Sequence, residues 1–180
     1  LEEKKIVVSR ARYSVEYPAN FTLVAAMNPC PCGYYNHPTK ECTCSPGSVH
    51  RYMGRISGPL MDRIDLHVEV TPVTPQELSA AAPGEASAAV RERVIRARAV
   101  QEARFGGVEG VHTNSMMNSA MLREYCRLDA ASAALLERAM ERLSLSARAY
   151  DRILKVARTI ADLAGRETIA AADVAEAINY

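Results

Sequence analysis

The sequence lacks a long apolar run and has no excess of charge of either sign. Nowhere do its 180 residues approach the ~20 apolar residues of a membrane-spanning helix, and the first residues, LEEKK, lack the apolar core of a signal peptide. We therefore expect a cytoplasmic protein with no membrane partner. The 22 Lys and Arg residues nearly cancel the 21 Asp and Glu residues, so any contact with nucleic acid must be local.

The chain also lacks an initial methionine and an even number of cysteines. Leu1 opens a segment with the character of a helix tail, so we expect the chain to be a piece of a longer polypeptide. Four of the five cysteines form two Cys-x-Cys pairs, a pattern that favours a reducing compartment and a metal over a disulfide scaffold. These four are Cys30, Cys32, Cys42 and Cys44.

The two Cys pairs lie in a loop, residues 29–48, that is too poor in large apolar side chains to pack without a cross-link. Four thiolates can close a tetrahedral zinc site that orders such a loop. The spacing is unusual, since Cys-x-x-Cys is commoner, and His37 can replace one ligand. Free thiols or redox pairs remain the alternative, but nothing else in the loop can order it.

The first half of the chain has the pattern of an α/β unit. Residues 6–9 and 13–17 flank a basic tip, and the alternation in 13–17 predicts a hairpin. Residues 21–27, FTLVAAM, are typical of a buried strand in a parallel sheet, and residues 66–70 alternate as a further strand. A short helix over 48–56 lies between them. Pro72, Pro75 and the tract at 80–87 then indicate a linker with a short turn of helix.

The second half is helical, with helices predicted over 87–105, 118–126, 130–143, 147–164 and 171–179. Asp129, Ser146 and Thr168 are the expected N-caps of the last three. Five arginines are expected to make the outer face of the first helix basic. The fold class is thus α/β plus all-α: a partial α/β core followed by a helical bundle.

Apolar stripes on these helices define the expected core. The inward residues are Leu135, Leu136, Ala139, Met140 and Leu143 on one helix, and Ile153, Val156, Ala157, Ile160 and Leu163 on the next. Cys126 is a further core residue.

Three polar residues are candidates for phosphate chemistry. Asn28 ends the strand at 21–27, where a carboxamide can orient a water and donate to a phosphate oxygen; a turn-forming Asn before Pro29 is the alternative. Arg63 precedes the strand at 66–70 and can reach a neighbouring subunit's nucleotide, or form a salt bridge with a flanking Asp. Arg148 lies in the first turn of a capped helix, which favours an anion, although most helical arginines are solvated.

Arg10 and Arg12 lie at the expected hairpin tip, where they can contact a phosphate backbone. A solvated turn is the alternative. The basic helix at 91–104 has the same ambiguity, and its interleaved glutamates favour an exposed structural face.

Three segments together, LVAAMNPCPCGY, ISGPLMDRIDLHVEV and LSARAYDRILKVARTIADLAG, resemble the Mg-chelatase-like AAA+ ATPases, in particular the ComM/YifB (competence protein) family. The resemblance covers nearly the whole chain. By that resemblance Asn28 takes the place of sensor 1, Arg63 that of the arginine finger and Arg148 that of sensor 2. The hairpin looks like the pre-sensor hairpin that faces the pore in related replicative helicases, which makes Arg10 and Arg12 DNA-contact candidates by analogy.

The resemblance implies a ring, expected to be a hexamer, that uses ATP and Mg²⁺ to remodel DNA by unwinding or branch migration during natural transformation or recombination. The four cysteines would hold a structural Zn²⁺. One departure is that no G-x-x-x-x-G-K-[ST] motif is present, and no glycine is followed by lysine. We therefore expect the C-terminal part of the parent, without detectable ATPase activity by itself.

The expected organisation has three parts. Residues 1–75 form the C-terminal half of the AAA+ α/β core with the Cys-rich loop 29–48, residues 76–110 a linker and basic helix, and residues 111–180 the helical lid. Two other functions remain open: a magnesium-chelatase motor subunit, and a non-enzymatic, zinc-stabilised interaction module.

Overall fold

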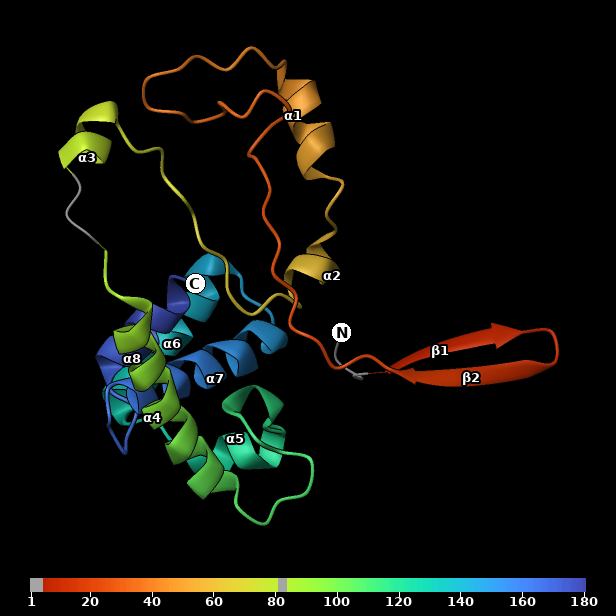
Figure 1. Ribbon diagram of the computed structural model, residues 1–180, viewed down its shortest axis with the longest axis vertical. Helices are drawn as coiled ribbons and strands as arrows, with labels where there is room; N and C mark the ends of the chain where they lie inside the picture. Colours follow the sequence, from red (N-terminus) through yellow and green to blue (C-terminus); the bar gives the residue numbers. More distant parts are fainter. Residues whose placement is uncertain (1–4, 81–83) are drawn as a thin grey trace. The chain divides into compact units, whose positions relative to one another are not determined.

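The computed structural model describes residues 5–80 and 84–180, which divide into one unit ending at Ile64 and a second beginning at Asp65. The first unit holds β1 (Lys5–Arg10), β2 (Tyr13–Pro18), α1 (Pro46–Met53) and α2 (Gly58–Met61). The second holds α3 (Pro75–Ala80), α4 (Ser87–Phe105), η1 (Asn114–Met116), α5 (Ser119–Tyr125), α6 (Ala130–Leu143), α7 (Ala147–Leu163) and α8 (Ala171–Ile178), as Figure 1 shows.

The predicted hairpin is confirmed. Strands β1 and β2 pair antiparallel, and the register sets Val8 opposite Val15 and Arg10 opposite Tyr13 around a two-residue turn. Because cross-strand partners share a face, one face is mainly apolar. It carries Ile6, Val8, Val15 and Tyr17, and ends in Arg10 and Tyr13. On the other face, Lys5 Nζ lies 3.0 Å from Glu16 Oε2.

Two expected strands do not form. Residues 21–27 and 66–70 belong to no sheet, and the β1–β2 hairpin is the one sheet within residues 5–80 and 84–180. A strand needs a neighbouring strand that takes up its backbone N–H and C=O groups, and within the described residues neither segment has one; the His67 N–H donates to the Tyr180 carbonyl instead. Their apolar side chains are accordingly exposed, with Val24 at 89% and Val70 at 86%.

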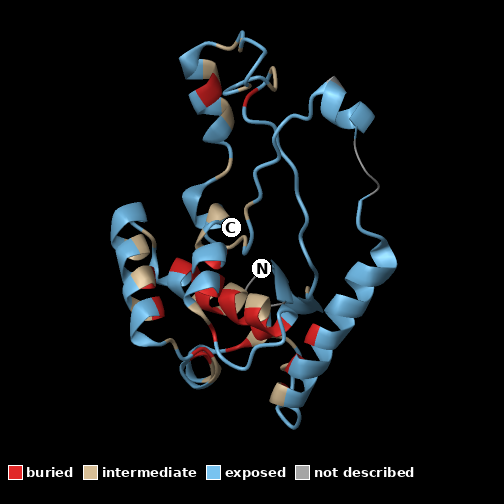
Figure 2. Cartoon of the chain, turned by 90° about the vertical axis from the view of Figure 1, so that its left-hand side faces the viewer, coloured by how far each residue is buried: buried red, intermediate tan, exposed pale blue. Residues whose placement is uncertain are grey.

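The second unit is a helical bundle built around α7. This helix packs against α4, η1, α5 and α8, and α6 packs against α8. Figure 2 shows that most buried segments fall in these helices. The core cluster consists of Phe105, Met117, Leu122, Cys126, Leu136, Ile153, Leu154, Ala157, Ala161, Ile169, Val174 and Ala177. A partial α/β core followed by a helical bundle is therefore the observed fold class.

Helix caps follow the predictions at two of three positions. The Asp129 Oδ1 atom accepts the backbone N–H of Ser132 at 2.7 Å, and Ser146 Oγ accepts that of Ala149 at 3.2 Å. Thr168 is not the cap of α8, because the helix begins later, after Ala170. There the Asp173 carboxylate accepts the Ala170 N–H at 2.9 Å, so an acidic side chain of the first turn reaches back to the residue before the helix, as in one half of a capping box.

The predicted core stripes are correct in their middle and wrong at their ends. Leu136, Ile153, Ala157 and Cys126 are buried as expected. Leu143 and Leu163 are 53% and 42% exposed because each is the last residue of its helix, beyond the packed layer.

A buried ion-pair network fixes α7 against its neighbours. Asp162 is only 4% exposed. Its carboxylate accepts hydrogen bonds from both terminal nitrogens of Arg104, at 2.8 and 2.5 Å, and from Nδ2 of Asn114 at 2.7 Å. Arg158 donates to the same carboxylate at 3.1 Å and to the backbone carbonyls of Arg166 and Glu167. Arg104 therefore does not belong to the outer basic face predicted for α4, because it faces α7.

Candidate functional site

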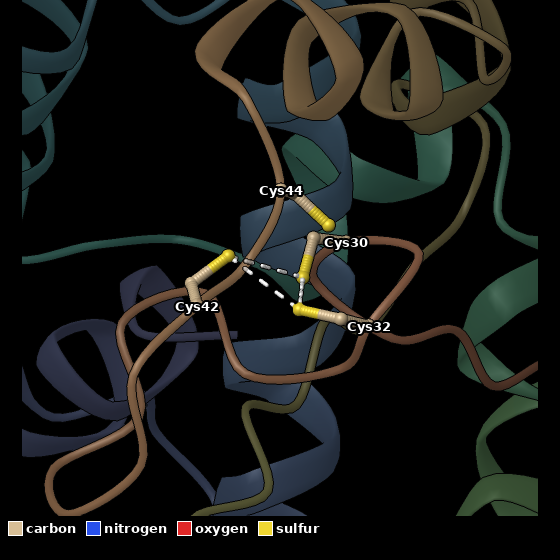
Figure 3. Close-up of side chains that lie close together, drawn as sticks. All are labelled: Cys30, Cys32, Cys42 and Cys44. Carbon is tan, nitrogen blue, oxygen red and sulfur yellow. Dashed lines mark hydrogen bonds between the residues drawn. The ribbon is translucent and has the colours of Figure 1, made fainter.

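The four cysteines of the two Cys-x-Cys pairs come together in the first unit. Their sulfur atoms all lie within 4.8 Å of one another. The Sγ atoms of Cys30 and Cys32 are 3.3 Å apart, those of Cys32 and Cys42 3.5 Å, and those of Cys30 and Cys42 3.8 Å, as the dashed lines in Figure 3 mark. A zinc tetrahedron with Zn–S bonds of ~2.3 Å has S–S edges of ~3.8 Å, so the observed spacing is that of a tetrathiolate site.

Tight turns bring the two pairs together. The Gly33 N–H donates to the Cys30 carbonyl at 3.0 Å, and Gly33 has a φ of +83°, a conformation that glycine adopts without strain. The loop beyond it is closed by His37, whose Nδ1 accepts the backbone N–H groups of Thr39 and Lys40 at 3.2 and 3.0 Å. His37 is therefore a turn residue and is not a member of the sulfur cluster.

Backbone amides and neighbouring thiols set the electrostatics of the cluster. A hydrogen bond from the Tyr34 backbone is the largest influence on Cys32; with the Cys30 side chain and the Thr43 backbone it lowers the pKa of Cys32 to about 5 against the opposing effect of burial. The Cys44 backbone lowers the pKa of Cys42, but burial and the sulfurs of Cys32 and Cys30 outweigh it and raise that pKa to about 12. Thiolate formation at Cys32 is thus favoured and a second thiolate beside it is disfavoured, a repulsion that a bound cation would relieve.

These residues fit a divalent zinc ion. Sulfur ligands in a tetrahedral arrangement are typical of structural zinc, and backbone N–H groups donating to thiolates are the outer contacts that such sites use. Cys30 is fully buried and the other three are partly buried, so the cluster has no broad open face for a substrate. The arrangement is that of a closed, structural site rather than a catalytic one.

Asn28 lies directly before the cysteine turn. A Cβ atom placed on Gly33 would lie 4.0 Å from Cγ of Asn28, so the carboxamide is next to the glycine turn that gathers the first Cys pair. Asn28 itself is exposed. Asn28 is thus two residues before the first cysteine of the cluster and next to the turn that follows it.

Arg63 follows the short helix α2. Its Nη1 donates to the carbonyl of Pro59 at 2.8 Å, which holds the half-buried guanidinium against its own helical turn. Ser57 and Pro59 begin that turn and set its direction. Arg63 and Asn28 both belong to the first unit.

Arg148 belongs to the second unit and is the second residue of α7. Its side chain is exposed at the end of the helix where backbone N–H groups favour anions. Ser146 caps this end, and the Asp162 network fixes the other end of the same helix. The structure thus gathers the four cysteines into one cluster, next to Asn28, and leaves the roles of Asn28, Arg63 and Arg148 as predictions.

Arg10 and Arg12 lie at the tip of the hairpin, as predicted. Arg10 ends β1 and Arg12 is in the turn, and both side chains are exposed. Neither guanidinium is paired with any residue of the described part of the chain.

The sequence analysis overlooked two features of this region. Lys40 Nζ lies 4.8 Å from the centre of the Tyr34 ring, a cation–π contact that closes the loop between the Cys pairs. The role of Gly33 beside Asn28 was also missed, although a glycine right after Cys-Pro-Cys is a turn signal.

Comparison with known proteins identifies the family. The chain matches the family described as magnesium chelatase, subunit ChlI C-terminal, over residues 84–180, and magnesium chelatase, subunit ChlI, over residues 1–78. The chain belongs to the magnesium chelatase ChlI family. It is a member of the ChlI-like AAA+ proteins.

Curated relatives extend the match over the whole chain. It is 45% identical over 182 residues to the competence protein ComM of Haemophilus influenzae and 41% identical over 181 residues to YifB of Escherichia coli. A protein of Mycobacterium tuberculosis is 38% identical over 180 residues. All of this chain is covered in each case, but it spans only about a third of the length of these relatives. Among the helices described, none has the length and apolar character that crossing a bilayer requires.

Proposed function

We propose that this chain is the sensor and lid part of a ring-forming AAA+ ATPase that couples ATP hydrolysis to the remodelling of DNA in the cytoplasm. The observation that carries the proposal is the exposed basic hairpin tip in a chain of the ChlI family. Residues 6–15 contain Arg10 and Arg12 and no carboxylate, although the chain as a whole is close to neutral. One relative is named a competence protein, which supports the expected role in natural transformation.

Three residues act at the nucleotide in this proposal. Asn28 orients the attacking water at the γ-phosphate of its own subunit, and Arg63 reaches the nucleotide of the neighbouring subunit. Arg148, at the start of α7, binds phosphate oxygens of a nucleotide as well. ATP and Mg²⁺ are the cofactors, with the phosphate-binding loop supplied by protein outside this chain.

Exposed apolar segments support a larger parent protein. Residues 21–27 and 66–70 have strand-like sequences but no strand neighbour here, and burying their apolar side chains would be favourable. We assign both to a parallel sheet completed by residues outside the chain. The chain spans about a third of its relatives, which agrees with this assignment.

The cysteine cluster acts as a structural clamp in the same scheme. Cys30, Cys32, Cys42 and Cys44 would hold one Zn²⁺, and the turn at Gly33 joins that site to Asn28. Zinc supplies no chemistry to hydrolysis here. Its role is to keep the loop 29–48 folded and Asn28 in place.

ATP hydrolysis by the full-length protein, measured with and without DNA, tests the proposal. We expect DNA to stimulate the wild type and Arg63→Ala to lower the rate roughly a thousandfold or more. Arg55→Ala is the matched control, because Arg55 is an exposed arginine between α1 and α2, and it should keep normal activity. The 180-residue chain alone should show no hydrolysis above background. Normal activity in Arg63→Ala would refute the proposal.

Two alternatives are separated by the same assay. A magnesium-chelatase motor subunit is favoured by the family description, and it would hydrolyse ATP without any response to DNA. A non-enzymatic module is favoured by the closed cysteine cluster, and it would assemble normally with Arg63→Ala and hydrolyse nothing.

A further inference from the structure

The hairpin tip carries an exposed aromatic ring beside its two arginines. Tyr13 is 72% exposed, more than Tyr17 at 53% on the same face nearer the hairpin base. It is the cross-strand partner of Arg10 in the last pair before the turn. Side chains of such a pair lie on one face with Cβ atoms about 4.5–5.5 Å apart. The tip of the β1–β2 hairpin, whose strands Figure 1 shows, therefore carries one aromatic residue and two arginines within four consecutive residues.

This combination differs from the rest of the apolar face. Ile6, Val8, Val15 and Tyr17 are 44–54% exposed and have no charged cross-strand partner on their face, so protein can cover them at little cost. Burying Tyr13 under protein would also desolvate Arg10, which is unfavourable without an anion. A ligand that offers a flat π-face and negative charge satisfies both side chains at once.

We propose that Tyr13 is a stacking platform for an unpaired base of single-stranded DNA, while Arg10 and Arg12 bind the flanking phosphates. Unpaired bases and phosphates are the chemistry that aromatic rings interleaved with basic groups recognise. In a duplex the base faces are stacked on one another, so the platform selects single strands. The inference rests on the proposed action on DNA and adds which form of DNA is bound and by which residue.

The absence of tryptophan from the chain allows a direct test. Tyr13→Trp places the single tryptophan of the chain at the hairpin tip, where its indole can be excited at wavelengths that tyrosine does not absorb, and Tyr17→Trp is the matched control nearer the base. Each is titrated at low salt with dT15, with an abasic 15-mer that has phosphates but no bases, and with a duplex. Anisotropy of the labelled oligonucleotides reports binding independently.

We expect dT15 to quench the indole fluorescence of the Tyr13→Trp variant, the abasic strand to bind without quenching, and Tyr17→Trp to stay unquenched. Replacing Tyr13 by Val should weaken binding of dT15 roughly 5- to 150-fold and leave binding of the abasic strand unchanged. Tyr13→Phe should bind dT15 as tightly as the wild type, because it keeps the aromatic ring. Arg10→Ala should weaken both single strands alike and reduce the salt slope by about 0.7.

Two other outcomes have distinct meanings. Equal binding of dT15 and the abasic strand, with no loss in Tyr13→Val, would overturn the stacking platform and leave DNA as a partner. Absence of binding to all three oligonucleotides would overturn the platform and count against the proposed function as well.

Discussion

Asp162 is the residue whose removal should most damage the helical bundle. Its carboxylate is buried and accepts four hydrogen bonds, two from Arg104 and one each from Asn114 and Arg158. Arg158 is itself only 2% exposed. Asp162→Ala would leave two guanidinium groups facing each other at the interface of α4 and α7 with no anion between them.

The expected loss is large because a buried charge is left uncompensated. Removing one partner of a buried ion pair costs about 3–5 kcal/mol in the free energy of unfolding. For a unit the size of residues 65–180, this corresponds to a fall in melting temperature of roughly 12–20 °C. Asp162→Asn keeps the shape and some hydrogen bonds, so it should cost less.

The same carboxylate makes the free energy of unfolding depend on pH in the acid range. Burial raises the pKa of Asp162, but the hydrogen bonds from Arg104 and Asn114 and the charge of Arg158 outweigh it, so the pKa is lower in the folded state. A folded-state pKa below the unfolded value, about 3.9 for Asp, contributes stability that is present above about pH 4 and lost as the pH falls through the folded pKa.

Urea unfolding followed by circular dichroism, at pH 7 and across the acid range, measures both effects. Glu137→Ala is the control, because Glu137 lies on the exposed side of α6 and its removal should change stability by less than about 0.5 kcal/mol. A loss below about 1 kcal/mol in Asp162→Ala, or an unchanged acid response, would refute the reasoning.

Three further predictions concern the core, a cap and the metal. Leu136→Ala should cost about 2–5 kcal/mol in urea unfolding, whereas Leu143→Ala, at an exposed helix end, should cost under about 1; similar losses would contradict the described core. Ser146→Ala should cost about 1 kcal/mol in the same assay by removing the hydrogen bond to the Ala149 N–H, and Ser146→Asp should retain the stability. Elemental analysis of protein purified without chelator should give one zinc per chain. Adding a chelator should make four thiols reactive, while buried Cys126 should stay unreactive until the protein unfolds. Less than about half an equivalent of zinc, with freely titratable thiols, would exclude the site.

Local signals in the sequence were sufficient for the hairpin, most helices and the cysteine cluster. The hairpin is encoded by alternation around its turn, and Asp129 and Ser146 mark helix starts through hydrogen bonds within three residues. The clustering of the two Cys-x-Cys pairs could be predicted because a loop poor in apolar side chains needs a cross-link to be ordered, and a metal held by four thiolates supplies one. Each of these features depends on residues close together in the chain.

Features that depend on distant partners could not be predicted in the same way. Residues 21–27 have the composition of a strand, but a strand exists only where another pairs with it. Arg104 shares a face of α4 with buried Ala97 and Gln101, but an arginine is expected to be solvated, and only the packing of α4 on α7 shows that Asp162 is its partner. Thr168 failed as a cap because α8 begins at Ala171, so the capping position falls on Ala170, whose N–H donates to the Asp173 carboxylate.

The central claim is that Asn28 and Arg63 serve one ATP from two neighbouring subunits, and a mixing experiment tests it most directly. Full-length Asn28→Ala and Arg63→Ala proteins, carrying different affinity tags and co-purified as mixed rings, would each be inactive alone. In random rings about a quarter of the interfaces join an intact Asn28 to an intact Arg63, so about a quarter of the wild-type hydrolysis rate should return. A mixture no more active than either variant alone would contradict the claim.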